Sequence, residues 1–140
     1  MQLKHSVLVD VSLDFAWRYR TDITTWKDPP ATFALDGPFA PGSRGVTTIP
    51  GMEPMPWVIQ EVKPRQSFAL EMPLKQATLR FEWHFTRIDE THTRLTQRIV
   101  LSGENASAYA GQVKAGFGPN LASGMQKLAE EMKAKQGLWP

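Results

Sequence analysis

The chain has 140 residues, of which 41% are apolar and 21% are charged, and its formal net charge at pH 7 is +2. This balance is typical of a globular protein with a hydrophobic core and excludes an intrinsically disordered chain. The sequence contains no cysteine, which excludes disulfides, thiol nucleophiles and thiolate metal sites. We therefore expect a single domain over residues 1–140, in a reducing cytoplasmic compartment.

The sequence shows no signal for a membrane or a nucleic-acid partner. Its first residues lack the apolar core of a signal peptide, and no apolar run approaches the roughly 20 residues of a membrane-spanning helix. Lysine and arginine are scattered and interleaved with acidic residues, whereas a nucleic-acid-binding surface normally has a basic cluster. We expect neither partner, and the sequence leaves a homodimer open as one oligomeric state.

The first half of the chain alternates short strand patterns with turn formers. A strand at residues 4–11 precedes a short helix that Ser12 can cap, because its hydroxyl can accept a hydrogen bond from the first turn. A second helical turn at residues 23–27 carries Trp26 and ends at two prolines. Further strands are predicted at residues 31–35, 44–49, 57–63 and 68–72, and the proline-rich segment 50–56 is expected to be an irregular loop.

The clearest strand pattern lies at residues 78–89, where large apolar residues alternate with polar ones. A hairpin at residues 90–92 connects it to a seventh strand at residues 94–101. Pairing Asp89 with Thr93 keeps the apolar residues of both strands on one face and sets Phe85 opposite Gln97. In this register the amide of Gln97 points inward.

A long amphipathic helix is predicted at residues 106–135. Proline in a helix interior removes a backbone hydrogen bond, so we expect the helix to be kinked or to begin anew at Pro119, beside Gly116 and Gly118. A helix of this length needs a broad apolar surface, and the strands can supply one. The order of elements therefore predicts an α+β fold, a curved antiparallel sheet of six to seven strands around the terminal helix. The apolar stripe of the helix recurs every three or four positions: Val113, Phe117, Leu121, Met125, Leu128 and Met132.

Several short motifs point to a family when their order and spacing are taken together. They are residues 12–17 with Asp22 and Trp26, residues 37–39 with 42–43, residues 57–59 with Val62 and Pro64, residues 93–96, and residues 102–103. In this order they resemble the START-like, helix-grip superfamily (SRPBCC), in its polyketide cyclase/dehydrase-like branch. The resemblance spans nearly the whole chain. It implies a helix-grip fold with a pocket between the concave sheet face and the terminal helix, and a small hydrophobic, lipid- or polyketide-like ligand. The glycine-rich turns fit neither a phosphate-binding loop nor a dinucleotide-binding fingerprint, so we expect no cofactor.

The candidate lining of that pocket is apolar and comes from strands, turns and helix. Each of these residues can also be an ordinary core residue. Gln97 is the candidate polar contact, because a buried amide needs a partner, and an internal hydrogen bond is the alternative. The apolar candidates are Trp26, Trp57, Phe68, Leu70, Phe81, Trp83, Phe85, Ile99, Phe117 and Leu121, with Met125 beside them.

Catalytic and metal sites are harder to place. Thr47 and Glu61 are weaker polar candidates. A buried Glu61 could act as a general base, since desolvation raises a carboxyl pKa, whereas a solvated strand glutamate is the alternative. The three histidines share no metal-ligand spacing, so we predict no metal. No catalytic residue is assigned, because the superfamily has no universal catalytic motif.

Three functions remain at this point. The first is binding of a small hydrophobic or aromatic ligand without chemistry, and the second is a cyclase or dehydratase, a lyase or isomerase acting on a polyketide-like substrate. The third is a purely structural or partner-binding module. An enzyme should place two ionisable groups with perturbed pKa values in the pocket, and only Glu61 is offered, so binding is favoured. We expect a cavity of about 300–1,000 Å³, entered past the 50–56 loop, the Trp26 turn and a hinge at residues 116–119.

Overall fold

A computed structural model describes residues 1–138 of the chain. The predicted elements are all present, and their ends shift by one or two residues at most. The elements are β1 (Gln2–Val9), α1 (Leu13–Arg20), the 3₁₀ helix η1 (Ile23–Thr25), β2 (Thr32–Asp36), β3 (Arg44–Thr48), β4 (Met55–Lys63), β5 (Ser67–Leu74), β6 (Ala77–Asp89), β7 (His92–Ser102) and α2 (Ala106–Lys135).

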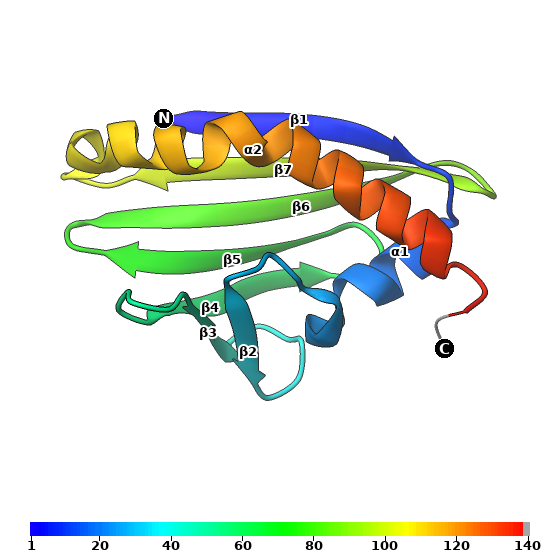
Figure 1. Cartoon of the computed structure of the whole chain (residues 1–140), viewed down its shortest axis with the longest axis horizontal. Helices are drawn as coiled ribbons and strands as arrows, with labels where there is room; N and C mark the ends of the chain where they lie inside the picture. The colour runs from blue at the N-terminus through cyan, green and yellow to red at the C-terminus, as the bar shows by residue number, and fades with distance from the viewer. Residues whose placement is uncertain (139–140) are drawn as a thin grey trace.

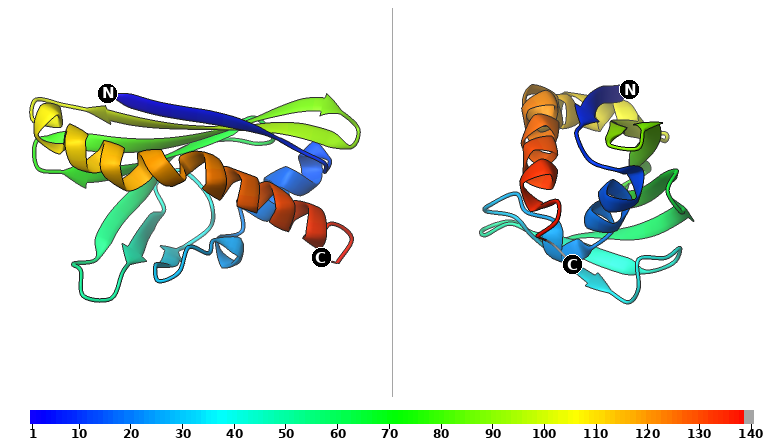
Figure 2. Two further views of the ribbon diagram at one scale, coloured as in Figure 1. Left: turned by 45° about the horizontal axis from the view of Figure 1, so that its top comes forward. Right: turned by 90° about the vertical axis from the view of Figure 1, so that its right-hand side faces the viewer.

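The seven strands form one antiparallel sheet in the order β1-β7-β6-β5-β4-β3-β2. Figure 1 shows α2 running along the β1–β7 side of the sheet, with α1 near the far end of α2. In the end-on view of Figure 2 the sheet curves around both helices, which lie on its concave side. This is the α+β helix-grip architecture that the sequence predicts. Within residues 1–138, neither helix combines the length and hydrophobicity that a bilayer-spanning segment needs.

Local capping sets the start of the two short helices. Ser12 accepts a hydrogen bond at its hydroxyl from the Phe15 amide (3.2 Å), as expected for an N-cap residue. Asp22 does the same for η1 by accepting from the Thr24 amide (2.9 Å). Arg20 at the end of α1 and Trp26 after η1 both contact tryptophans of the concave sheet face.

The β6–β7 register differs from the predicted one by two residues. Phe85 pairs with Leu95, and Trp83 pairs with Gln97. A register shift between Arg87 and Asp89 moves the hairpin relative to the pattern expected from a regular turn. Because side chains alternate with a period of two, a two-residue offset leaves every side chain on its predicted face.

The long helix is continuous through Pro119, so the expectation that it begins anew there is wrong. Figure 1 shows its two halves inclined to one another, which fits a bend at a proline that removes one backbone hydrogen bond. The buried residues of α2 are Val113, Met125, Ala129 and Met132, whereas Leu121 and Leu128 are half-buried and Phe117 is exposed.

Candidate functional site

Five predicted site residues form one aromatic cluster on the concave face. Trp26 follows η1 and stacks on Trp57 (ring centres 5.7 Å apart) and on Phe68 (6.4 Å). Phe68 in turn contacts Trp83 (6.4 Å) and Phe85 (6.1 Å). All but the half-buried Trp26 are buried. We call Trp26, Trp57, Phe68, Trp83 and Phe85 the aromatic cluster, and its rings fill the end of the concave face beside α1.

Further along the concave face the apolar packing is incomplete. The core consists of two groups of buried residues, and three half-buried side chains contact both groups: Met72, Phe81 and Leu121. Phe117 on α2 lies edge-on to Phe81, with ring centres 5.4 Å apart, and remains 37% exposed. We call Met72, Phe81, Phe117 and Leu121 the central patch. The other two apolar candidates, Leu70 and Ile99, are buried in one core group each.

Neither of two pockets formed by residues 1–138 coincides with the predicted interior cavity. One pocket, about 430 Å³, lies on the outer sheet face and is lined by Gln2, Lys4, His84, Thr96 and Arg98. The other, about 420 Å³, lies between Leu3 and one side of α2. The physical reason is that the aromatic side chains expected to line a cavity contact one another instead. A ligand at the concave face would therefore sit at the central patch and displace side chains there.

Arg20 is the residue that sequence reasoning missed. It ends α1, and its guanidinium lies between two indole rings, with Cζ 4.3 Å from the centre of the Trp83 ring and 4.7 Å from that of Trp26. The Trp26 indole N–H donates to the Arg20 backbone carbonyl (2.8 Å), which locks the stack. The sequence does contain a signal for this position. Arg20 is four residues after Ala16, a buried residue of the same helix, so both residues lie on the inward face of α1.

The guanidinium of Arg20 carries no ion pair and no hydrogen bond with any of residues 1–138, and its Nε is inaccessible to solvent. Burial lowers the pKa of Arg20 to about 10, although the nearby Glu131 and Tyr19 work in the opposite direction. The group is therefore charged at neutral pH. It is a half-buried cation whose Nε is closed off from solvent and has no acceptor within residues 1–138.

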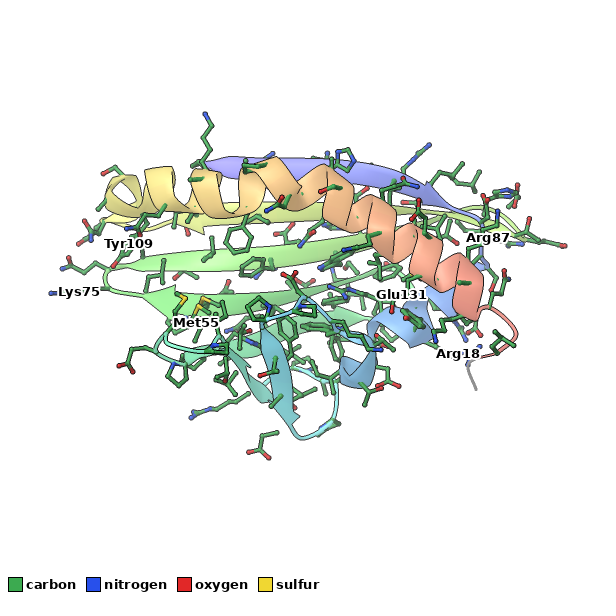
Figure 3. The ribbon with its side chains drawn as sticks, in the orientation of Figure 1. Arg18, Met55, Lys75, Arg87, Tyr109 and Glu131 are labelled. Atoms are coloured by element: carbon green, nitrogen blue, oxygen red, sulfur yellow. The ribbon has the colours of Figure 1, made fainter. Side chains whose placement is uncertain are left out.

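A hydrogen bond ties α1 to α2 next to this cation. The Tyr19 hydroxyl donates to Glu131 Oε1 at 2.6 Å. Figure 3 shows Glu131 on the part of α2 that faces α1. Burial, followed by the hydrogen bond to Glu131, raises the pKa of Tyr19, so Tyr19 remains a neutral phenol.

Gln97 lies on the concave face, as predicted, and is half-buried. It is the direct cross-strand neighbour of Trp83 on β6 and of His5 on β1. Its amide has no hydrogen-bond partner among the residues that the structure describes, so the alternative of an internal hydrogen bond does not apply within them. Gln97 and Arg20 thus bring unpaired donors to the same end of the concave face.

The two weaker polar candidates have other roles. A register shift between Ile59 and Glu61 reverses the alternation of β4 and turns Glu61 to the outer face. There it pairs with Lys63 (2.9 Å) and Arg80 (3.2 Å). Its side chain is 40% exposed, so the burial that the general-base role required is absent, and the hydrogen bond from Lys63 is the largest cause of its lowered pKa. Thr47 accepts from the Trp57 indole N–H (3.0 Å), which satisfies both groups.

Solved structures share this fold at low sequence identity. The Zhui aromatase/cyclase from Streptomyces sp. R1128 is 15% identical, with a TM-score of 0.72 over 96% of this chain and 94% of its own. Norcoclaurine synthase from Thalictrum flavum, in complex with dopamine and hydroxybenzaldehyde, is 15% identical, with a TM-score of 0.69 over 94% and 87%. Protein NE0264 from Nitrosomonas europaea is also 15% identical, with a TM-score of 0.75 over 98% and 97%.

These likenesses concern the fold, since all three identities are low. No curated protein matches the sequence. The family described as "Polyketide cyclase / dehydrase and lipid transport" matches residues 1–135, nearly the entire chain. With the helix-grip fold and the concave-face site in view, the chain belongs to this polyketide cyclase/dehydrase and lipid transport family of SRPBCC proteins.

Proposed function

We propose that this protein binds a small hydrophobic or aromatic molecule at the central patch, between α2 and the concave face of the sheet. One observation carries the proposal: Met72, Phe81 and Leu121 connect the two halves of the core, yet each remains partly open to solvent. Half-buried apolar side chains that converge from two strands and a helix are the lining expected of a small-ligand site. The family description, which names lipid transport, agrees with such a ligand.

Phe117 is the side chain that a ligand would displace. It covers Phe81 from the helix side while its own ring is 37% exposed. Its neighbours Gly116 and Gly118 leave room around it, because a Cβ at Gly116 would meet no heavy atom within 4 Å. Because its ring already borders solvent, movement of Phe117 away from Phe81 would open the central patch from the α2 side.

The proposal is tested with N-phenyl-1-naphthylamine, an uncharged dye whose emission rises in an apolar site. The wild type should enhance the emission saturably, and Phe117→Ser should weaken binding about tenfold, equivalent to about 1.4 kcal/mol. The displaced Phe117 ring would pack against the bound ligand, and loss of this aromatic contact is the physical reason.

Ile88→Ser is the matched control. Ile88 is 46% exposed near the far end of β6, so it tests the loss of an exposed hydrophobic residue away from the site. This variant should bind the dye as the wild type does. Equal weakening in both variants, or no enhancement with the wild type, would contradict binding at the central patch.

A cyclase or dehydratase of the same site is the second candidate. The observation that favours it is the group of ionisable residues beside the aromatic cluster, where Arg20 and Tyr19 both have shifted pKa values and Glu131 is bonded to Tyr19. Perturbed pKa values of this kind are typical of functional sites. Incubation with a linear poly-β-ketone, followed by chromatography and mass spectrometry, separates the two functions. A cyclase changes the retention time of the compound at unchanged mass, a dehydratase removes a molecule of water, and a binding protein returns the compound unchanged.

A further inference from the structure

Two arginines, Arg80 on the outer face and Arg20 on the concave side, differ in their ion pairing within residues 1–138. On the outer face, Arg80 contacts three carboxylates at 2.8–3.2 Å, those of Glu61, Glu71 and Glu82. On the concave side, Arg20 has no carboxylate within ion-pair distance among residues 1–138. Both arginines are half-buried, but Arg80 is held in direct ion pairs, whereas Glu131 acts on Arg20 from beyond ion-pair distance.

The two tryptophans around Arg20 do not replace that counter-ion. The face of an indole ring attracts the flat face of a guanidinium. Arg20 Cζ lies 4.3 Å from the ring centre of Trp83 and 4.7 Å from that of Trp26. The five N–H donors of a guanidinium lie in its plane, along its edge. The indole stack therefore orients the group and leaves its donors for an acceptor in that plane.

The position of Arg20 relates this unpaired cation to the proposed ligand site. The Arg20 guanidinium lies over the ring of Trp83. Trp83 is two residues from Phe81 on β6, a spacing of about 7 Å along one face of a strand. Gln97 lies opposite Trp83 on β7, and its amide has no partner within residues 1–138. Two unpaired polar side chains thus adjoin one end of the central patch.

We propose that the ligand of this protein is an organic carboxylate, whose charged group is bound by the guanidinium of Arg20 with the Gln97 amide and whose apolar body lies on the central patch. The planar fork of a guanidinium matches the two oxygens of a carboxylate. A carboxylate would also give the half-buried guanidinium a direct counter-ion and its Nε an acceptor, which gives it an advantage over a neutral ligand of the same shape. This inference rests on the proposed function and adds the chemical class of the ligand.

The test compares 2-naphthoate with the neutral 2-naphthalenemethanol, which share one aromatic body, by tryptophan fluorescence titration at pH 7. The wild type should bind the carboxylate at least tenfold more tightly than the alcohol. Arg20→Met should bind both equally. The control Arg94→Met removes the same charge from an exposed position of β7 and should keep the wild-type preference.

A second measurement needs only the wild type. In a nitrogen-detected spectrum of the arginine side chains, 2-naphthoate should shift one Nε–H resonance strongly, and the alcohol should shift it little. The inference is overturned if both compounds bind the wild type equally, if Arg20→Met keeps the preference, or if bound naphthoate moves no arginine resonance. Failure of the proposed function looks different, because then neither compound binds.

Discussion

Gly45 lies directly under the indole ring of Trp57 on the neighbouring strand. The two residues are a cross-strand pair of β3 and β4, and a Cβ built on Gly45 would overlap the six-membered ring of Trp57. The same indole donates to Thr47 two residues along β3 (3.0 Å). Gly45 and Thr47 together fix the plane of Trp57, and Trp26 stacks on that plane.

Replacing Gly45 with alanine should therefore destabilise the protein. The added methyl group must push Trp57 out of its position, and overpacking of this kind costs typically 1–3 kcal/mol. The free energy of unfolding, measured by urea denaturation, should fall by about that amount. Because Trp57 supports Trp26, tryptophan emission of the folded state should change as well. An unchanged unfolding free energy would contradict the close packing of this pair.

Gly116→Ala should have the opposite effect on stability. Gly116 lies inside α2, it is exposed, and a Cβ there meets nothing within 4 Å. Alanine at an exposed position inside a helix gives a more stable protein than glycine by about 0.5–1 kcal/mol.

By contrast, Gly103→Ala should destabilise the protein, since Gly103 has a φ of +112° and its Cβ would lie 2.8 Å from the Ala77 backbone.

The double variant Gly116→Ala with Gly118→Ala tests whether this part of α2 is the entrance. A stiffer helix beside Phe117 should slow both dye association and dye dissociation, while the equilibrium affinity changes less. Stopped-flow fluorescence measures both rates. Unchanged rates would mean that the ligand enters elsewhere, for example past the 50–56 loop.

The contacts of Glu82 on the outer face predict how the stability of the protein changes at acid pH. Its side chain is 13% exposed and contacts Arg80 (2.8 Å), Arg98 (3.2 Å) and His84 (3.2 Å). Burial alone would raise the pKa of Glu82, but the hydrogen bonds from Arg80 and His84 and the charge of Arg98 outweigh it and lower the pKa. A lowered carboxyl pKa contributes stability above the unfolded-state value, and this contribution is lost as the pH falls through the folded-state value.

Glu82→Gln should therefore be less stable than the wild type by about 1–3 kcal/mol at neutral pH, and the difference should shrink toward about pH 3. Thermal denaturation of both proteins across this range measures it. Glu53→Gln, in the exposed loop before β4, is the control and should follow the wild type throughout. A difference that stays constant with pH would show that the charge of Glu82 is not responsible.

The sequence alone was sufficient for the fold, because each element carries its own period. The stripe that includes Val113, Met125 and Met132 predicts the buried side of α2, and alternation puts Gln97 on the concave face even though the predicted register was off by two residues. Local irregularities of the strands, by contrast, were not visible in the sequence. The register shift after Ile59, which turns Glu61 outward, has no glycine or other marker in the sequence.

The placement of the candidate residues was predicted in part. The apolar candidates lie on the concave side, but whether aromatic rings line a cavity or contact one another depends on side-chain packing that periodicity does not describe. The ring contacts of Trp26 and Phe68 are of this kind. Arg20 was missed because a basic residue in the last turn of a helix is expected to be exposed and to interact with the helix dipole. The neighbouring Arg18 is exposed in this way.

Binding at the central patch is tested most directly with protein labelled with ¹³C at its methionine methyl groups. Met72 belongs to the patch, whereas Met1 and Met52 are exposed elsewhere. On addition of N-phenyl-1-naphthylamine, we expect the Met72 methyl resonance to shift and to show nuclear Overhauser effects to dye protons, with Met1 and Met52 unchanged. Dye binding that leaves Met72 unmoved, or that shifts only Met1 or Met52, would contradict a ligand site between α2 and the sheet.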